Sequence, residues 1–280
     1  MKLGVLGSGT MGNGIAQAIA SVGLPVVLCD VDANKLDLAA KTIESSVIRI
    51  LKKQNKPLEE VQAIISNIQF TTDNTELRDV DIIIEAIVEN MEVKKKVFSE
   101  LDVICNKNTI FASNTSGLSI TELGAATNRA SQVIGMHFFN PVPLMKLVEV
   151  VKGAHTSEAT YETATEVVKL LGKESITVLD APLFIVNRIL IPMMNEAMVV
   201  LEEGIASVED IDKGMQLGAN HPIGPLALAD LIGLDTLLFV AETLFKETGD
   251  SKYRVPLILK KLVRAGDLGR KSGKGFYTYQ

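Results

Sequence analysis

The segment Gly7-Ser-Gly-Thr-Met-Gly12 constrains the fold of this chain more than any other feature. It follows an apolar run at residues 2–6 and precedes a helical pattern that we expect to begin near Met11. In this context the first glycine permits a tight turn, the second lets the backbone approach a pyrophosphate, and the third lets the helix pack closely on the strand. The N–H groups at the start of the helix add affinity for phosphate. We therefore predict a Rossmann-type dinucleotide-binding unit, in which the cofactor lies against Gly7, Ser8, Gly9, Thr10, Met11 and Gly12.

A carboxylate at the end of the second apolar run indicates which dinucleotide binds. Asp30 lies 18 residues after Gly12, where its side chain can accept hydrogen bonds from the adenine ribose and repel a 2′-phosphate. Asp32 is a rival for this contact, but it lies beyond the expected end of the strand and is more suited to cap the next helix. The sequence therefore favours NAD over NADP.

Up to about residue 180, short β-rich runs alternate with helical patterns, which is typical of a doubly wound parallel sheet. The apolar runs at 26–28 and 82–84 are continuous rather than alternating, as expected of strands covered on both faces. The expected strands cover residues 2–7, 25–30, 68–71, 81–86, 109–112, 132–138, 147–151 and 175–178.

The pattern changes near residue 184, after which helical periodicity dominates until a short expected strand at 275–279. We predict an α/β fold with a Rossmann-type sheet domain at residues 1–181 and a smaller all-helical domain at residues 182–280. The segment 185–201 is apolar on more than one face, so it forms either a subunit interface or the central helix of the small domain. We expect this domain to close the substrate site and to support a homodimer or dimer-based oligomer.

Bulk composition excludes several classes of protein. A net charge of −6 argues against broad nucleic-acid binding. No window reaches the roughly 18 uninterrupted apolar residues of a membrane span, and the chain leads from Met1 directly into an expected strand. Cys29 and Cys105 lie in apolar runs, which indicates buried reduced thiols. We therefore expect a cytoplasmic protein with no membrane partner, and no residue pattern predicts a metal site.

One of the three histidines is placed for catalysis. His137 closes an apolar strand at the carboxyl edge of the sheet, where open α/β sheets bind ligands, whereas His155 and His221 lie in expected loop and turn segments. Glu149 lies in the next apolar strand, where a charge needs a partner. Adjacent strands would let Glu149 fix the tautomer of His137 as a general base for alcohol oxidation. A histidine that is simply satisfied within the core is the alternative.

Several segments together resemble the L-3-hydroxyacyl-CoA dehydrogenase family, in particular its bacterial 3-hydroxybutyryl-CoA dehydrogenase type. The similarity extends over the whole chain and implies NAD-dependent interconversion of (S)-3-hydroxyacyl-CoA and 3-ketoacyl-CoA. It also implies a preference for short acyl chains and a place in fatty-acid or butyrate metabolism. The segments that carry the resemblance are residues 7–12, Glu85-Ala-Ile-Val-Glu89, Ser113-Asn-Thr-Ser116, His137-Phe-Phe-Asn-Pro141, Phe184-Ile-Val-Asn-Arg188, 220–225 and 273–277.

The resemblance also implies roles for individual residues. His137 would act as the acid/base, oriented by Glu149, while Ser116 and Asn187 would hydrogen-bond the 3-oxygen of the substrate. Matching positions in the family contact coenzyme A through Ser46, Lys53 and Ser116. Those that contact NAD are Glu89, Lys94, Ser116, Asn140 and Lys271.

Helix periodicity adds Arg49 to the expected coenzyme A site. Ser46, Arg49 and Lys53 have the spacing i, i+3 and i+7, so they share one helix face and give an acidic protein a basic strip for phosphates. Taken alone, that face reads more readily as a solvated helix surface.

The chain departs from the family at one position, where Leu183 replaces the glycine that usually follows the equivalent of Pro182. If that glycine serves a left-handed backbone, Leu183 has to change the entry into the second domain. Two other functions are also consistent with parts of the sequence. One is a dehydrogenase of a free β-hydroxy acid, which would more commonly use a lysine base, and the other is a non-catalytic NAD-binding sensor or structural protein.

Overall fold

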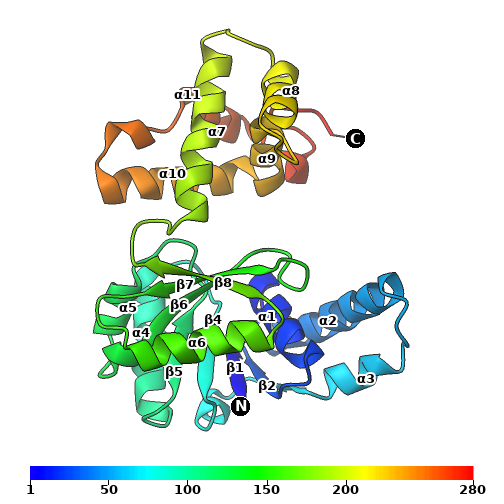
Figure 1. Cartoon of the computed structure of the whole chain (residues 1–280), viewed down its shortest axis with the longest axis vertical. Helices are drawn as coiled ribbons and strands as arrows, with labels where there is room; N and C mark the ends of the chain where they lie inside the picture. The colour runs from blue at the N-terminus through cyan, green and yellow to red at the C-terminus, as the bar shows by residue number, and fades with distance from the viewer. Residues whose placement is uncertain (280) are drawn as a thin grey trace. The chain divides into compact units, whose positions relative to one another are not determined.

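The computed structural model describes residues 1–279 and contains two compact units, Met1–Ala181 and a helical unit that begins at Pro182 (Figure 1). The first unit is built on an eight-stranded sheet with the order β3-β2-β1-β4-β5-β6-β7-β8. All eight expected strands are present. Their bounds are β1 Leu3–Leu6, β2 Val26–Cys29, β3 Ile68–Thr71, β4 Ile82–Glu85, β5 Ile110–Ser113, β6 Val133–Phe138, β7 Leu147–Lys152 and β8 Glu174–Leu179.

We expected a wholly parallel sheet, but the sheet is mixed. Strand β7 runs antiparallel to β6, whereas all other neighbouring strands are parallel. The connection at residues 139–146 contains no helix, and a parallel return needs a crossover of a dozen or more residues. This short connection therefore forces the chain to turn back, and it places the end of β6 beside the start of β7.

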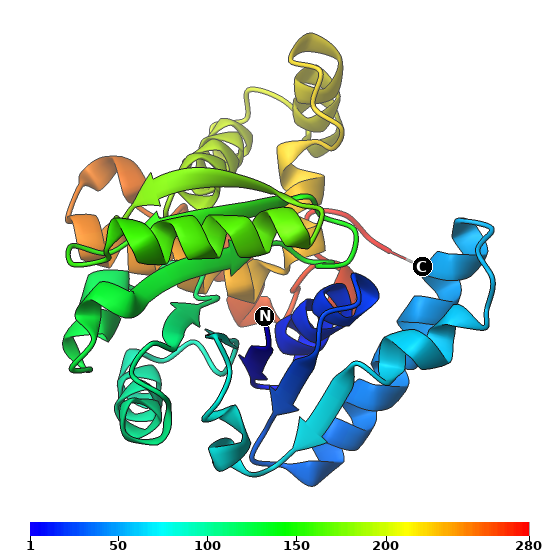
Figure 2. The same ribbon diagram turned by 60° about the horizontal axis from the view of Figure 1, so that its bottom comes forward.

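Helices cover the sheet, and strands β1, β2, β4 and β5 are buried along their whole length. Helix α1 packs on β1 and β2, and α6 packs on β6, β7 and β8 (Figure 2). Asp32 caps α2 by accepting from the N–H of Asn34, as predicted. The helices are α1 Thr10–Ser21, α2 Ala33–Lys53, α3 Glu60–Ile65, α4 Met91–Ile104, α5 Ile120–Ala125 and α6 Glu158–Leu170, with 3-10 turns η1 Asn74–Leu77 and η2 Ala130–Gln132.

The second unit is helical, with a core formed by residues such as Met194, Leu237 and Leu259. The strand expected at residues 275–279 is not formed, because the N–H groups of Phe276 and Tyr277 donate to the carboxylate of Asp230. In place of a continuous ladder, Lys274 forms isolated bridges with Gly269 and with Thr278. The helices are α7 Val186–Glu202, α8 Val208–Gly218, α9 Pro225–Ile232, α10 Leu234–Thr248 and α11 Leu257–Ala265, with 3-10 turns η3 Ser251–Tyr253 and η4 Arg270–Ser272.

Leu183 adopts the left-handed backbone that the usual glycine would serve. Its φ is +60° and that of Phe184 is +59°, a conformation that costs a residue with a Cβ roughly 1–2 kcal/mol. The side chain is 2 % exposed and packs in the core of the second unit. Burial of a leucine is worth about 1.5–3 kcal/mol, so packing offsets the strain.

Both cysteines are buried and free, as predicted. Burial raises the pKa of Cys29 to about 12 and that of Cys105 to about 11, so both thiols stay protonated at neutral pH. Within residues 1–279, no helix is both long enough and apolar enough to cross a membrane.

Candidate active site

The glycine-rich turn between β1 and α1 has the close approaches that its glycines predict. Gly7 has a φ of +99°, and a Cβ there would lie 2.6 Å from the carbonyl oxygen of Ala86. A Cβ at Gly12 would lie 1.7 Å from the carbonyl oxygen of Gly7. At Gly9, by contrast, a Cβ would meet no atom within 4 Å. The backbone at Gly9 is therefore open beside the start of α1, where a diphosphate can approach it.

Asp30 lies at the end of β2 and is held as a carboxylate. It accepts hydrogen bonds from the N–H of Ser8 at 2.7 Å, from Ser8 Oγ at 2.8 Å and from the N–H of Asp32 at 3.1 Å. Burial opposes ionisation, but these hydrogen bonds outweigh it and hold the pKa of Asp30 below its ordinary value. Asp30, Gly7 and Gly9 line one cavity of about 500 Å³, so a negative charge faces the space beside the glycine turn.

A buried ion pair that sequence reasoning missed lies at the end of β4. Glu85 is fully buried and Lys94 is 1 % exposed, and Lys94 Nζ donates to Glu85 Oε1 at 2.6 Å. Glu85 also accepts from the N–H of Ile87 at 2.7 Å and from Ser113 Oγ at 2.7 Å. The available signal was the same as for Glu149, namely a carboxylate within an apolar strand.

Glu89 links this ion pair to Ser116. Its Oε2 lies 3.3 Å from Lys94 Nζ. Its Oε1 accepts from Thr115 Oγ at 2.6 Å, from the N–H of Ser116 at 2.9 Å and from Ser116 Oγ at 3.2 Å. Three residues expected at the cofactor or substrate, Glu89, Lys94 and Ser116, therefore belong to one network.

His137 and Glu149 face each other directly in the antiparallel register of β6 and β7. The distance from His137 Nδ1 to Glu149 Oε2 is 2.6 Å, with Glu149 fully buried and His137 6 % exposed. The ring of Phe139 packs against the imidazole with a centroid distance of 4.5 Å. A carboxylate at Nδ1 favours the tautomer whose Nε2 carries the lone pair, which is the form that a general base needs.

Two of the four residues expected at coenzyme A line a cavity of the first unit, while Ser116 belongs to the network of Glu89. Ser46 and Arg49 share a space of about 460 Å³ with Asn140 and the start of α1. Lys53 lies one turn farther along α2 and is absent from the described lining of this cavity. The structure thus groups Asn140, expected at NAD, with the phosphate-binding candidates.

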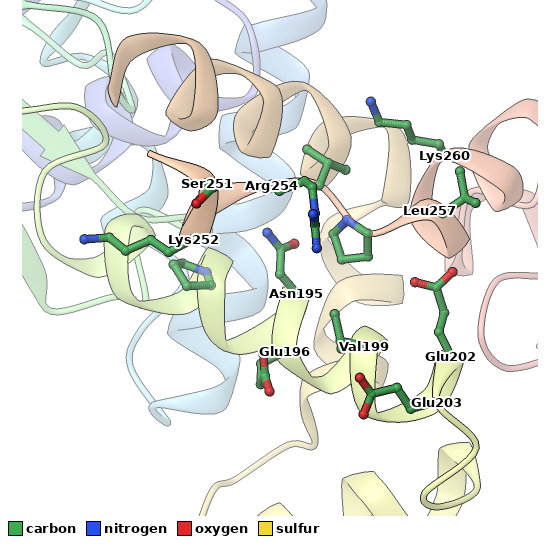
Figure 3. A pocket seen from close by; sticks show the side chains of 13 residues that line it. Asn195, Glu196, Val199, Glu202, Glu203, Ser251, Lys252, Arg254, Leu257 and Lys260 are labelled. Atoms are coloured by element: carbon green, nitrogen blue, oxygen red, sulfur yellow. The ribbon is translucent and has the colours of Figure 1, made fainter. Parts of the chain in front are cut away.

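The other predicted residues lie in the second unit. Asn187 is in the first turn of α7, and Lys271 in η4 forms an ion pair with Asp235 at 2.5 Å. A cavity of about 760 Å³ between α7 and the segment from η3 to α11 includes none of the predicted site residues in its described lining (Figure 3).

Comparison with known proteins decides the family. The model for the NAD binding domain of 3-hydroxyacyl-CoA dehydrogenase matches residues 2–181, and that for its C-terminal domain matches residues 184–279. The chain belongs to the 3-hydroxyacyl-CoA dehydrogenase family. It is 49 % identical to a 3-hydroxybutyryl-CoA dehydrogenase of Clostridioides difficile, with 100 % of this chain and 99 % of the relative covered.

A mammalian relative and a solved structure extend this likeness. The chain is 43 % identical to the mitochondrial hydroxyacyl-coenzyme A dehydrogenase of Homo sapiens, with 99 % of this chain and 90 % of the relative covered. The crystal structure of (S)-3-hydroxybutyryl-CoA dehydrogenase from Ralstonia eutropha superposes with a TM-score of 0.97 at 50 % identity, and 100 % and 99 % of the two chains are covered.

As a member of the 3-hydroxyacyl-CoA dehydrogenase family, the protein is an oxidoreductase whose cofactor is NAD. The first unit fits that cofactor on structural grounds. The backbone at Gly9 is open, an ionised Asp30 stands at the end of β2, and both line the same cavity. NAD bound there would be held at its diphosphate by the start of α1 and at its ribose by Asp30.

Proposed function

We propose that this enzyme interconverts (S)-3-hydroxybutyryl-CoA and acetoacetyl-CoA, with NAD as the hydride carrier and His137 as the acid/base. The observation that carries the proposal is the contact between His137 and Glu149, buried at the carboxyl end of a sheet that also presents the NAD cavity. Similarity to 3-hydroxybutyryl-CoA dehydrogenases over the full chain supports the substrate.

Each of these residues has a separate role in the reaction. In the oxidative direction, His137 Nε2 takes the proton of the 3-hydroxyl group, and Glu149 stabilises the imidazolium that forms. NAD held by the start of α1 and by Asp30 would supply the acceptor for the hydride from C3. Ser116 and Asn187 hydrogen-bond the 3-oxygen and so orient the reacting carbon, a role that raises the effective concentration of the aligned reactants. In reduction, His137 returns the proton to the oxygen.

The phosphates of coenzyme A are assigned to the cavity beside α2. Arg49 supplies charge and Ser46 a hydroxyl donor, with Lys41 on the same cavity wall. Guanidinium groups match phosphate in a bidentate geometry. A local basic strip of this kind explains how a protein with a net charge of −6 can hold a polyanionic substrate.

An NADH-oxidation assay tests the proposal. Acetoacetyl-CoA should be reduced faster than longer 3-ketoacyl-CoAs and much faster than free acetoacetate, and NADPH should support a lower rate than NADH. Equal rates with acetoacetate and acetoacetyl-CoA would instead support a dehydrogenase of free β-hydroxy acids. Measurable NADH binding without oxidation by any 3-ketoacyl-CoA would support a non-catalytic NAD-binding protein.

We also propose that a second copy of the chain packs on α7. This helix buries Met194 and Met198 in the core, so it is the central helix of its unit, but it leaves Ile189 64 % exposed. Acidic side chains on α7, Glu196 and Glu202, lie across the cavity from basic ones on the opposite wall (Figure 3). Under two-fold symmetry the acidic wall of one copy can face the basic wall of the other.

The oligomeric state tests this assembly. Light scattering after size exclusion should give the mass of a dimer for the wild type and a shift toward monomer for Ile189→Glu, because a buried unpaired charge opposes association. Leu217→Glu is a matched control, since Leu217 is 77 % exposed on α8. A wild type that is monomeric at every concentration would contradict the proposed interface.

A further inference from the structure

We propose that Glu85 is a positioning residue of the active site, which orients Ser116 through Lys94 and Glu89. The inference rests on the proposed function, because Ser116 is assigned there to the 3-oxygen of the substrate. Glu85 itself is fully buried and touches neither substrate nor cofactor in this scheme. Its effect would pass through two intervening side chains.

Strand register places Glu85 between two segments of the site. Glu85 pairs with Leu6, which precedes the glycine turn, and with Ser113, which begins the segment that contains Ser116. The backbone continues these ladders, because the N–H of Ala86 donates to the carbonyl of Leu6 and the N–H of Asn114 donates to that of Glu85. Glu85 therefore lies next to both the glycine turn and the segment 113–116, so a change at Glu85 can displace either one.

The carboxylate of Glu85 holds Lys94 in one place. Lys94 is 1 % exposed, and burial of an ammonium is costly unless a carboxylate pairs with it. Lys94 Nζ lies 2.6 Å from Glu85 Oε1 and 3.3 Å from Glu89 Oε2, so Glu85 is the closer counter-ion. The other oxygen of Glu85 accepts from Ser113 Oγ, which prevents rotation of the carboxylate away from Lys94.

Lys94 in turn holds Glu89 in the orientation that binds Ser116. With Oε2 directed at Lys94, Oε1 of Glu89 accepts from Thr115 Oγ, the N–H of Ser116 and Ser116 Oγ. If the Lys94 ammonium is not held in place, the Glu89 carboxylate loses the positive charge that fixes its orientation. The hydroxyl of Ser116 would then sample orientations that are not aligned with the 3-oxygen, and misalignment of about 1 Å can slow a reaction 10²-fold.

The variant Glu85→Gln tests this chain of contacts, because glutamine keeps the size of the side chain and removes its charge. The reduction of acetoacetyl-CoA should show kcat lowered about tenfold or more, with KM for acetoacetyl-CoA changed less than about threefold. NADH affinity, measured by fluorescence titration, should fall about fivefold, since Lys94 and Glu89 match NAD contacts. Ser113→Ala removes one hydrogen bond to Glu85 and should give a smaller change in the same direction.

Glu92→Gln is the matched control. Glu92 lies in the first turn of α4, as Lys94 does, and pairs with Lys95 at 3.2 Å. Its side chain, however, is 83 % exposed. This variant should match the wild type in kcat and in NADH affinity. The double variant Glu85→Gln/Lys94→Met should be no slower than the worse of its two single variants, because residues that act as one unit are not additive.

Several outcomes would overturn the proposal. A purely structural role predicts that Glu85→Gln lowers the melting temperature but leaves kcat and NADH affinity of the folded enzyme unchanged. If Glu85→Gln does not fold, unchanged kcat and NADH affinity in Ser113→Ala overturn it instead. Failure of the proposed function is distinguishable, because the wild type would then bind NADH without reducing acetoacetyl-CoA, and the NADH titration would still test the network.

Discussion

Two buried glutamates end up at the same edge of the sheet with different partners. Glu149 meets His137 and Glu85 meets Lys94, each at 2.6 Å and each with the carboxylate fully buried. A histidine side chain exchanges protons near neutral pH, whereas a lysine ammonium normally keeps its proton. The same geometry therefore suits one pair to move a proton and the other to hold neighbouring side chains in place.

The two pairs also differ in how the chain builds them. His137 and Glu149 are joined by strand register alone, because the short 139–146 connection makes β7 run back along β6. Lys94 instead lies in the first turn of α4, which begins just beyond β4. From there its side chain extends back to Glu85 at the end of that strand. Because its partner lies at a strand end rather than across a ladder, Lys94 also meets Glu89, and Glu85 also accepts from Ser113.

Replacement of His137 should have the largest effect, because it removes the group that accepts the proton. We expect His137→Gln to lower kcat by on the order of 10²-fold or more while NADH binding stays intact. Steady-state NADH oxidation with acetoacetyl-CoA measures the first quantity, and fluorescence titration the second. His155→Gln, at an exposed loop position, is the control. Near-normal turnover in His137→Gln would remove His137 from the mechanism and with it the contrast between the pairs.

Replacement of Glu149 should have a smaller effect, because the base remains while its orientation and charge stabilisation weaken. We expect Glu149→Gln to lower kcat on the order of 30-fold. KM for acetoacetyl-CoA should change much less than kcat, because Glu149 acts on the imidazolium that forms during the reaction. Unlike Glu85→Gln, Glu149→Gln should leave NADH affinity unchanged. A loss of NADH affinity of equal size in both variants would mean that the two carboxylates share one role.

The sequence predicted the first of these pairs and missed the second. A histidine at the end of an apolar strand and a carboxylate in the next one were enough to predict contact, since adjacent strands leave few other partners. Glu85 is likewise a carboxylate in an apolar strand, but its partner lies on a helix. Helix periodicity does not show whether the Lys94 side chain extends back to the end of β4. The antiparallel direction of β7 was not predicted either. A short connection without a helix does not by itself show which neighbouring strand the chain will pair with, or in which direction.

Backbone conformation marks a second limit of sequence reasoning. The residue at position 183 was expected to matter only if its backbone were left-handed, and the structure gives it a φ of +60° despite its side chain. Leucine is tolerated there because burial offsets the strain. The balance depends on the shape of the core in the second unit, which the order of residues does not reveal. The glycines of the nucleotide turn were predictable because their spacing follows from strand, turn and helix geometry.

Asp30 supplies a third carboxylate at this edge and the smallest of the expected effects. Its nearest hydrogen-bond donors are Ser8 and the N–H of Asp32, so it neither moves a proton nor fixes a buried ammonium. We expect Asp30→Ala to narrow the preference for NADH over NADPH about tenfold, because the repulsion of a 2′-phosphate is lost. The ratio of kcat/KM for the two cofactors is the measurement.

The hydrogen bonds on Asp30 give this prediction a pH dependence. They hold its pKa below the ordinary value despite burial, so the carboxylate stays charged as the pH falls from 8 toward about 5. The wild type should therefore keep its preference for NADH across that range. Asp32→Ala, which removes only the cap of α2, should lower stability by about 1 kcal/mol and leave the cofactor ratio unchanged. If Asp32→Ala changes the ratio and Asp30→Ala does not, the ribose contact belongs to Asp32, and Asp30 serves the glycine turn through Ser8.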